Sequence, residues 1–300
     1  MLHVAFHPDY VHPIPKGHKF PMEKYQLLPE QLIYEGTLEN TNFFEPDICE
    51  DQHLLRTHDA DYLSRLEQLQ LTPREQRVSG FVHSEQLIQR EKRIMEGTRL
   101  CAEKALTSGA AMNIAGGTHH AYSNKGEGFC LLNDQAVAAN WLLDEKLVSR
   151  ILIVDLDVHQ GNGTAELFQD RDEVFTFSMH GKNNYPLKKE VSDRDVELMD
   201  GTSDREYLRQ LERNLGEVLE TFQPDFMFYQ CGVDVLETDK LGRLSLSMNG
   251  CKQRDEYVFE QVAELGIPVV CTMGGGYSKE IKYIVEAHAN TFRTIQSVLF

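Results

Sequence analysis

The chain of 300 residues carries a net charge of −17, and 41% of its residues are hydrophobic. Such an acidic balance argues against a protein that wraps a nucleic-acid backbone, which needs positive charge, but it would attract a basic ligand such as a lysine-rich peptide or a polyamine. No stretch approaches the roughly 18 to 20 uncharged apolar residues that span a bilayer, and the first residues lack the basic and apolar regions of a signal peptide. We therefore expect a cytoplasmic protein without nucleic-acid or membrane partners.

In chain order, apolar runs and helical periodicity predict a strand at 2–6, a helix at 84–106, a strand at 111–115, a helix at 133–147, strands at 151–158 and 174–179, a helix at 203–222, a strand at 226–233, a helix at 252–266 and a strand at 268–275. Most of the strand runs are continuously apolar, as in parallel strands covered on both faces. Without a repeat or a linker, this alternation predicts one α/β domain over residues 1–300, with an open parallel sheet between helices. In such sheets, binding sites form beyond the C-terminal ends of the strands.

Six cysteines are spread along the chain: Cys49, Cys101, Cys130, Cys231, Cys251 and Cys271. No pair has the CxxC spacing of a thiolate zinc cluster. Several lie in apolar runs, where a free cysteine behaves as a small hydrophobic residue. We interpret all six as reduced packing residues.

The third predicted strand runs into groups that are costly to bury, Asp155, Asp157 and His159. Because side chains alternate along a strand, these three should project to one side. Carboxylate and neutral imidazole together suit Zn²⁺, Fe²⁺, Mn²⁺ or Co²⁺. Gly161 and Gly163 then allow the backbone to turn into a helix. The alternative is a loop start with solvated charges.

Three other strand ends carry groups that fit the same site. Asp234 would be the third protein ligand that a catalytic zinc ion usually has. His119 and His120 follow a glycine turn and can transfer protons near pH 7. Tyr277 follows three glycines and can donate a hydrogen bond to a developing oxyanion. Taken singly, Asp234 could cap a turn, the two histidines could be a surface pair, and Tyr277 could be a phenol packed under a loop. Taken together, they favour one site.

The motifs that carry these residues also resemble those of a known family. "GGTHHA", "GEGFCLLND", "VDLDVHQGNGT", "FSMH", "GVDVLETDKLGRLSLS" and "GGGY" follow the order and approximate spacing found in the metal-dependent histone deacetylase superfamily. "HQGNG" and "HKFPMEKY" most resemble its class IV branch and bacterial relatives. The resemblance implies the arginase/deacetylase fold, which is a single-domain, three-layer αβα structure with a mostly parallel sheet of about eight strands.

The resemblance also implies a ligand set. It implies a zinc or ferrous ion held by Asp157, His159 and Asp234 at the end of a narrow tunnel. The residues that it implies for the tunnel and the substrate are Gly128, Phe129, Tyr185, Leu241 and Gly275. It implies a structural K⁺ ion at Asp155, Asp157, His159, Ser178 and Met179. It implies a second monovalent site on backbone around Phe168, Arg171 and Val174.

From this resemblance we expect hydrolysis of an N-acyl-lysine amide by a metal-activated water. His120 would take the proton of the water and later protonate the leaving amine, while Tyr277 would donate to the oxyanion. His119, paired with Asp155, would stay more cationic. The residue expected to face His120 is Asn162, where many relatives have an aspartate. A neutral amide stabilises imidazolium less than a carboxylate does, which predicts a less basic His120.

Three other functions have to be weighed. A ureohydrolase of the same fold would hold two Mn²⁺ ions and needs an aspartate two residues after Asp234, where this chain has Leu236. A non-catalytic acyl-lysine binding protein could lack a ligand or the phenol, and none is missing. An acetylpolyamine or other small-molecule amide deacetylase would place a carboxylate near the tunnel mouth, for which the candidates are Glu23, Glu127 and Glu190. The sequence motifs leave open which acyl group is removed, which metal is native and which oligomeric state the protein has.

Overall fold

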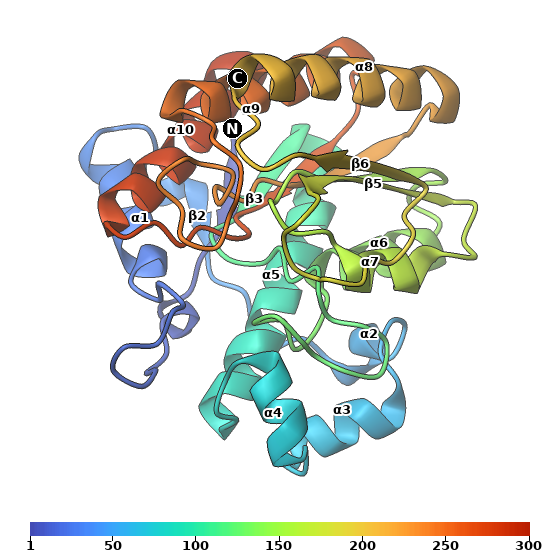
Figure 1. The fold of residues 1–300 in the computed structure, drawn as a ribbon. Helices are drawn as coiled ribbons and strands as arrows, with labels where there is room; N and C mark the ends of the chain where they lie inside the picture. Colours follow the sequence, from blue (N-terminus) through green and yellow to red (C-terminus); the bar gives the residue numbers. More distant parts are fainter.

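The computed structural model describes residues 1–300 and contains one eight-stranded sheet (Figure 1). The strands are β1 (His3–Ala5), β2 (Phe43–Phe44), β3 (Ala110–Asn113), β4 (Ile151–Asp155), β5 (Val174–Gly181), β6 (Arg194–Leu198), β7 (Phe226–Gln230) and β8 (Val269–Thr272). They are ordered β2-β1-β3-β8-β7-β4-β5-β6, and every neighbouring pair is parallel. The parallel sheet expected from the continuous apolar runs is therefore confirmed.

Helices cover both faces of this sheet. They are α1 (Lys24–Tyr34), α2 (Asp51–Leu54), α3 (Ala60–Glu67), α4 (Pro73–Ser79), α5 (Glu85–Ser108), α6 (Asp134–Asp144), α7 (Asn162–Phe168), α8 (Asp204–Phe222), α9 (Met248–Leu265) and α10 (Ile281–Leu299). In Figure 1, α8, α9 and α10 lie on one side of the sheet and α5, α6 and α7 on the other. The result is the three-layer αβα arrangement that the sequence predicted. None of these helices is long and apolar enough to cross a bilayer.

Buried apolar side chains form a cluster on each face of the sheet. Along β4, Leu152 and Val154 belong to the larger cluster, whereas Ile151 and Ile153 belong to the smaller one. Because alternate side chains point to opposite faces, a strand buried on both sides must be apolar at nearly every position. The six cysteines contribute to this interior as free, buried thiols, in agreement with the sequence interpretation.

Capping residues set the ends of the long helices. Ser84 accepts a hydrogen bond from the Leu87 N–H, and α5 begins directly after it. Ser247 caps α9 in the same way, so this helix begins at Met248, four residues before the predicted start at 252. Gly266 ends α9 in the left-handed conformation, with φ +64°, which glycine adopts without a steric penalty.

Three of the predicted strands extend too far at their C-terminal ends, next to the functional side chains. The run 151–158 is a strand only as far as Asp155, and the runs 226–233 and 268–275 end as strands at Gln230 and Thr272. The apolar pattern continues because the residues beyond are still buried, although the backbone has left the sheet. The functional side chains therefore lie on loops. In the sheet, β3, β8, β7 and β4 are consecutive neighbours, so the loops that follow them converge.

Candidate metal centre and active site

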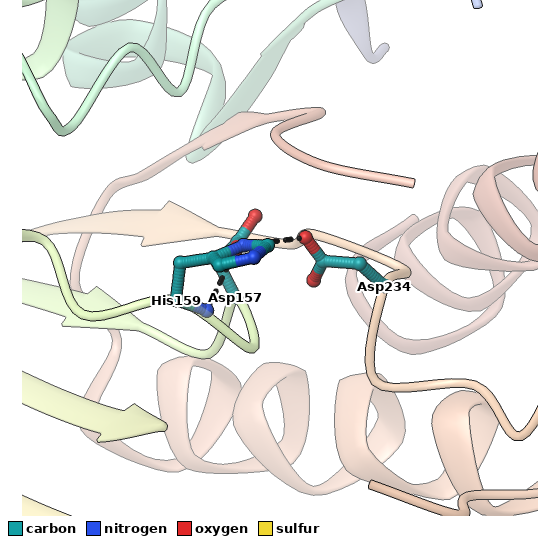
Figure 2. Close-up of side chains that lie close together, drawn as sticks. All are labelled: Asp157, His159 and Asp234. Carbon is teal, nitrogen blue, oxygen red and sulfur yellow. Dashed lines mark hydrogen bonds and ion pairs between the residues drawn. The ribbon is translucent and has the colours of Figure 1, made fainter. Parts of the chain in front are cut away.

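The loops after β4 and β7 bring Asp157, His159 and Asp234 together (Figure 2). One ligand atom from each residue can be chosen so that all lie within 4.8 Å of one another. His159 Nδ1 is 3.0 Å from Asp157 Oδ1 and 3.1 Å from Asp234 Oδ2. All three side chains are buried. The set predicted from the sequence thus faces a common point.

The chemistry of this donor set fits a divalent cation. Asp234 Oδ1 accepts from the Val158 N–H and Asp157 Oδ2 from the Gly275 N–H. Asp234 Oδ2 is buried without a hydrogen-bond partner, since its approach to His159 lacks hydrogen-bond geometry. Burial and the charge of Asp157 raise the pKa of Asp234 to about 7. A cation would satisfy the free oxygen and neutralise the carboxylate pair, and two oxygens with one imidazole suit zinc or iron.

Glycines provide the space for this centre. A Cβ atom on Gly275 would lie 2.1 Å from Asp234 Oδ2, and one on Gly232 would lie 2.2 Å from Asp157 Oδ2. The Gly275 N–H donates to Asp157, and its carbonyl accepts from the Val233 N–H. Both backbone polar groups of Gly275 are therefore occupied within the protein, and its missing side chain leaves room for the carboxylates. Gly275 also lines the cavity beside His120, His159 and Tyr277, and its contact with substrate stays a prediction.

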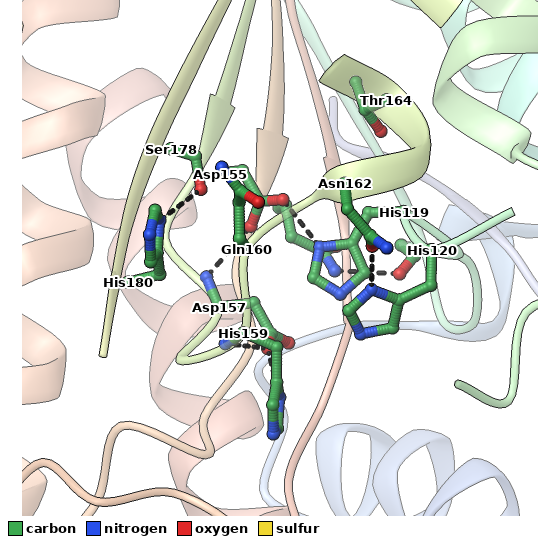
Figure 3. Close-up of polar contacts among 12 residues, drawn as sticks. His119, His120, Asp155, Asp157, His159, Gln160, Asn162, Thr164, Ser178 and His180 are labelled. Carbon is green, nitrogen blue, oxygen red and sulfur yellow. Dashed lines mark hydrogen bonds and ion pairs between the residues drawn. The ribbon is translucent and has the colours of Figure 1, made fainter. Parts of the chain in front are cut away.

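The two adjacent histidines lie beside the metal ligands on the loop after β3 (Figure 3). His119 Nδ1 is 2.6 Å from Asp155 Oδ2, and His120 Nδ1 is 2.6 Å from Asn162 Oδ1. The centroids of the two imidazole rings are 4.1 Å apart. Both pairings are those expected from the sequence. Each uses Nδ1 and leaves Nε2 for chemistry in the site.

Electrostatics separate the two rings. Burial lowers the pKa of His119, but the nearby Asp155 carboxylate outweighs burial and raises the pKa to about 8. Burial, together with the charges of His119 and His159, holds the pKa of His120 well below its usual value. At pH 7 His119 is therefore largely cationic and His120 neutral.

An apolar channel leads from the surface to His120 and His159. Its remaining lining residues are Val78, Gly128, Phe129, Tyr185, Leu241 and Tyr277. The His120 and Tyr185 rings meet edge to face, with centroids 5.1 Å apart. Four of the five predicted substrate residues therefore line the channel. Val78, at the end of α4, was not predicted, because nothing in its local sequence indicates that α4 reaches the channel.

The Tyr277 phenol lies at the inner end of this channel, close to the ligand set. Its ring centroid is 6.4 Å from that of His159 and 6.0 Å from that of Phe129. Burial and the charges of Asp234 and Asp157 raise the pKa of Tyr277 well above its usual value. The phenol consequently keeps its proton at neutral pH and can donate a hydrogen bond.

The residues predicted for the first monovalent cation lie on β4, on β5 and on the loop after β4. Asp155 and Ser178 are register partners in β4 and β5, and Met179 follows in β5. The Ser178 hydroxyl is 2.9 Å from His180 Nδ1 (Figure 3). The second predicted site consists of Phe168, Arg171 and Val174. These residues share a turn in which the carbonyls of the first two accept backbone hydrogen bonds. Potassium binding stays a prediction.

Comparison with known proteins identifies relatives over nearly the whole chain. The model of the histone deacetylase domain matches residues 18–292. An uncharacterized protein of Picosynechococcus sp. is 43% identical over 295 residues, which cover 98% of either chain. Histone deacetylase 2 of Arabidopsis thaliana is 33% identical over 281 residues, which cover 91% of this chain and 73% of that protein.

Two solved structures share the fold. A histone deacetylase homologue from Aquifex aeolicus superposes with a TM-score of 0.85 at 26% identity, and a homologue complexed with SAHA superposes with 0.86 at 27% identity. In both cases the match covers 99% of this chain and 84% of the other. The class IV-like placement stays a prediction. The family match, the relatives and the shared fold agree with the site geometry, and the chain belongs to the histone deacetylase family.

Proposed function

We propose that the protein is a metal-dependent deacylase that hydrolyses the amide of an N-acyl-lysine. The observation that carries this proposal is the ligand set Asp157, His159 and Asp234 at the inner end of an apolar channel, beside two imidazoles and a phenol. A zinc or ferrous ion held there would polarise the acyl carbonyl and lower the pKa of a water molecule.

The residues around this centre have distinct parts in the reaction. His120 is neutral, and its Nε2 accepts the proton of the attacking water and later gives it to the leaving amine. His119 carries positive charge beside it and offsets the negative charge that develops on the substrate. The Tyr277 phenol donates to the oxyanion, a contribution that in other enzymes is about 10²- to 10³-fold in kcat.

The channel favours a lysine side chain. Its walls are formed by Phe129, Tyr185, Leu241 and the glycine at 128, and such an apolar lining suits the methylene stem of lysine while the acyl group reaches the centre. The net charge of −17 favours a basic peptide around that lysine.

The acids predicted as candidates for recognising a polyamine do not line the channel. Glu127 is 9% exposed and contacts Asn162, and Glu190 accepts from the Tyr122 hydroxyl. Glu23 lines a neighbouring surface pocket, formed largely by residues 11–26, that shares Tyr277 with the channel. None of the three is among the residues that line the channel. This arrangement supports acyl-lysine over acetylpolyamine, which is the runner-up.

We further propose that residues 1–300 act as a single catalytic domain in the cytoplasm, with potassium as a structural ion and without nucleic-acid or membrane partners. The residues proposed to hold the potassium ion include Asp155 and Ser178, which are register partners in β4 and β5.

A substrate panel tests the proposal. Metal-free protein is loaded with Zn²⁺ or Fe²⁺ and assayed on lysine peptides with acyl chains of increasing length and on acetylpolyamines, with Asp157→Ala as the matched control. We expect acyl-lysine turnover that requires metal and is absent in the control. Turnover of polyamines alone would replace the proposal with its runner-up, and binding of acyl-lysine without turnover would make the protein a binding module.

A further inference from the structure

A buried acid lies directly behind the partner of His120. Asn162 Nδ2 donates to Glu127 Oε1 at 2.5 Å, while Asn162 Oδ1 is 2.6 Å from His120 Nδ1. Asn162 is 1% exposed and Glu127 9% exposed. The three side chains form one continuous line of hydrogen bonds from the carboxylate to the imidazole, although Glu127 and Asn162 are 35 residues apart.

An asparagine alone does not determine which end faces the histidine. Its amide has an accepting oxygen and a donating nitrogen of nearly the same shape. If the nitrogen faced His120, it would donate to Nδ1, and the ring proton would have to move to Nε2. The ring could then no longer accept a proton at the atom that faces the site. The orientation of this amide therefore decides whether His120 can act as a base.

Glu127 removes this ambiguity. A carboxylate only accepts hydrogen bonds, so it must face the Asn162 nitrogen. The Tyr122 hydroxyl also accepts from that nitrogen, at 3.0 Å, and donates its own hydrogen to Glu190. Both groups that meet the nitrogen end of the amide are thus acceptors, and the oxygen end is left for His120.

The backbone around Glu127 is shaped to bring it this close. Gly128 has φ +57°, and a Cβ atom there would lie 2.5 Å from His120 Cδ2. A Cβ atom on Gly126 would lie 2.6 Å from the Cys130 carbonyl. A side chain at either flanking position would push the segment away from the histidine.

We propose that Glu127 is a positioning residue that fixes the amide orientation of Asn162 and thereby holds His120 with its proton on Nδ1 and its Nε2 open to accept one. The inference rests on the proposed function for its effect on turnover, whereas the tautomer is a property of the folded chain by itself.

Two other contacts of Glu127 must be separated from this role. Its Oε2 is 3.5 Å from Lys125 Nζ, and its charge and a hydrogen bond contribute, after burial, to raising the pKa of Tyr185. If Glu127 acted through these residues, Lys125→Met or Tyr185→Phe would reproduce its loss. Lys125 is exposed and outside the site, so Lys125→Met is the matched control and should keep kcat within about twofold of wild type.

A double-mutant cycle on the metal-loaded full chain tests the proposal. Glu127→Gln, whose amide can also donate, should lower kcat about 10-fold, part of the 10²- to 10⁴-fold that a general base supplies, with little change in KM. In an Asn162→Asp background both oxygens of the new side chain accept, so no orientation needs fixing. Glu127→Gln in that background also removes the repulsion between two facing carboxylates, so it should cause no loss. An equal loss in both backgrounds would overturn the proposal and make Glu127 a structural residue.

The ¹⁵N signals of His120, assigned with His120→Ala, give a second readout that needs no substrate. Wild-type protein, with or without zinc, should show the Nδ1–H tautomer, and Glu127→Gln should show a mixture. An Nε2–H tautomer in the wild type would refute the proposal even if Glu127→Gln failed to fold. Should no acyl-lysine be turned over while the wild type shows the expected tautomer, the proposed function fails and the positioning role stands.

Discussion

Two neighbouring histidines with nearly the same geometry are given opposite electrostatic characters by their partners. His119 and His120 each bind an oxygen through Nδ1 at 2.6 Å, and both rings are buried. The partner of the first is the Asp155 carboxylate, and the partner of the second is the Asn162 amide. The pKa of His119 is raised to about 8 and that of His120 is held well below its usual range.

Burial lowers the pKa of both rings, and the charge of the hydrogen-bond acceptor sets them apart: the Asp155 carboxylate outweighs burial at His119, whereas at His120 burial and the positive charges of His119 and His159 meet no such opposing charge. Only a full charge nearby can reverse the effect of burial. A cationic ring beside a neutral one gives the site a fixed positive charge and a base at the same pH. In this protein the neutral acceptor brings a second requirement, because an amide has to be oriented and a carboxylate does not.

The largest expected effect comes from removing the rings one at a time. His120→Ala should lower kcat about 10³-fold, within the range of a lost general base. His119→Ala should lower it less, by about 10- to 100-fold, since it removes a charge and not the proton acceptor. Steady-state kinetics on a metal-loaded acyl-lysine assay measures both. Equal losses, or a larger loss for His119→Ala, would reverse the roles assigned to the pair.

A smaller effect is expected from giving His119 a neutral hydrogen-bond acceptor like that of His120. Asp155→Asn removes the charge that raises the pKa of His119 from 6.5 to about 8. A raised pKa in the folded protein contributes stability that is complete below pH 6.5 and lost as the pH rises through about 8. For a shift of this size the contribution is about 2 kcal/mol. Asp155→Asn should lack this pH-dependent contribution to the free energy of unfolding.

Urea unfolding of metal-free protein at pH 6 and pH 9 checks this expectation. The wild type should lose more stability than Asp155→Asn over this interval. Ser178→Ala, which leaves the His119–Asp155 contact in place, serves as the control and should follow the wild-type pH dependence. If Asp155→Asn loses as much stability as the wild type, Asp155 does not control the charge of His119.

The features that the sequence predicts are those that depend on local motifs. The ligands, the histidine pair and both of its partners were predictable because each lies within a motif at the end of a continuous apolar run. The sheet was predictable for the same reason, apart from β2, which has two residues, and β6, whose polar sequence Arg194–Leu198 reflects its position at the edge.

Residues that depend on long-range packing were not predictable. The sequence predicts Glu127 only as a candidate acid near the tunnel mouth. Its contact with Asn162 could not be predicted, because that contact depends on how a glycine-flanked segment bends. Val78 reaches the channel only through the placement of α4. The strand ends were misjudged because residues such as Leu156 stay buried after the backbone has left the sheet. Periodicity reports burial, and burial extends beyond hydrogen-bonded strands.

The smallest effect sharpens the comparison by giving both rings a carboxylate. Asn162→Asp should raise the pKa of His120, and a base with a higher pKa stays protonated up to a higher pH. The acidic limb of the kcat/KM profile should therefore move to higher pH by about one unit, with kcat above pH 8 changed only a few-fold. Because the new carboxylate faces Glu127, the profile is also measured in Asn162→Asp with Glu127→Gln, where that repulsion is absent. An acidic limb that stays in place in both variants would mean that the acceptor of His120 does not set its basicity, and the contrast between the two rings would then have to arise from their distance to the metal ligands.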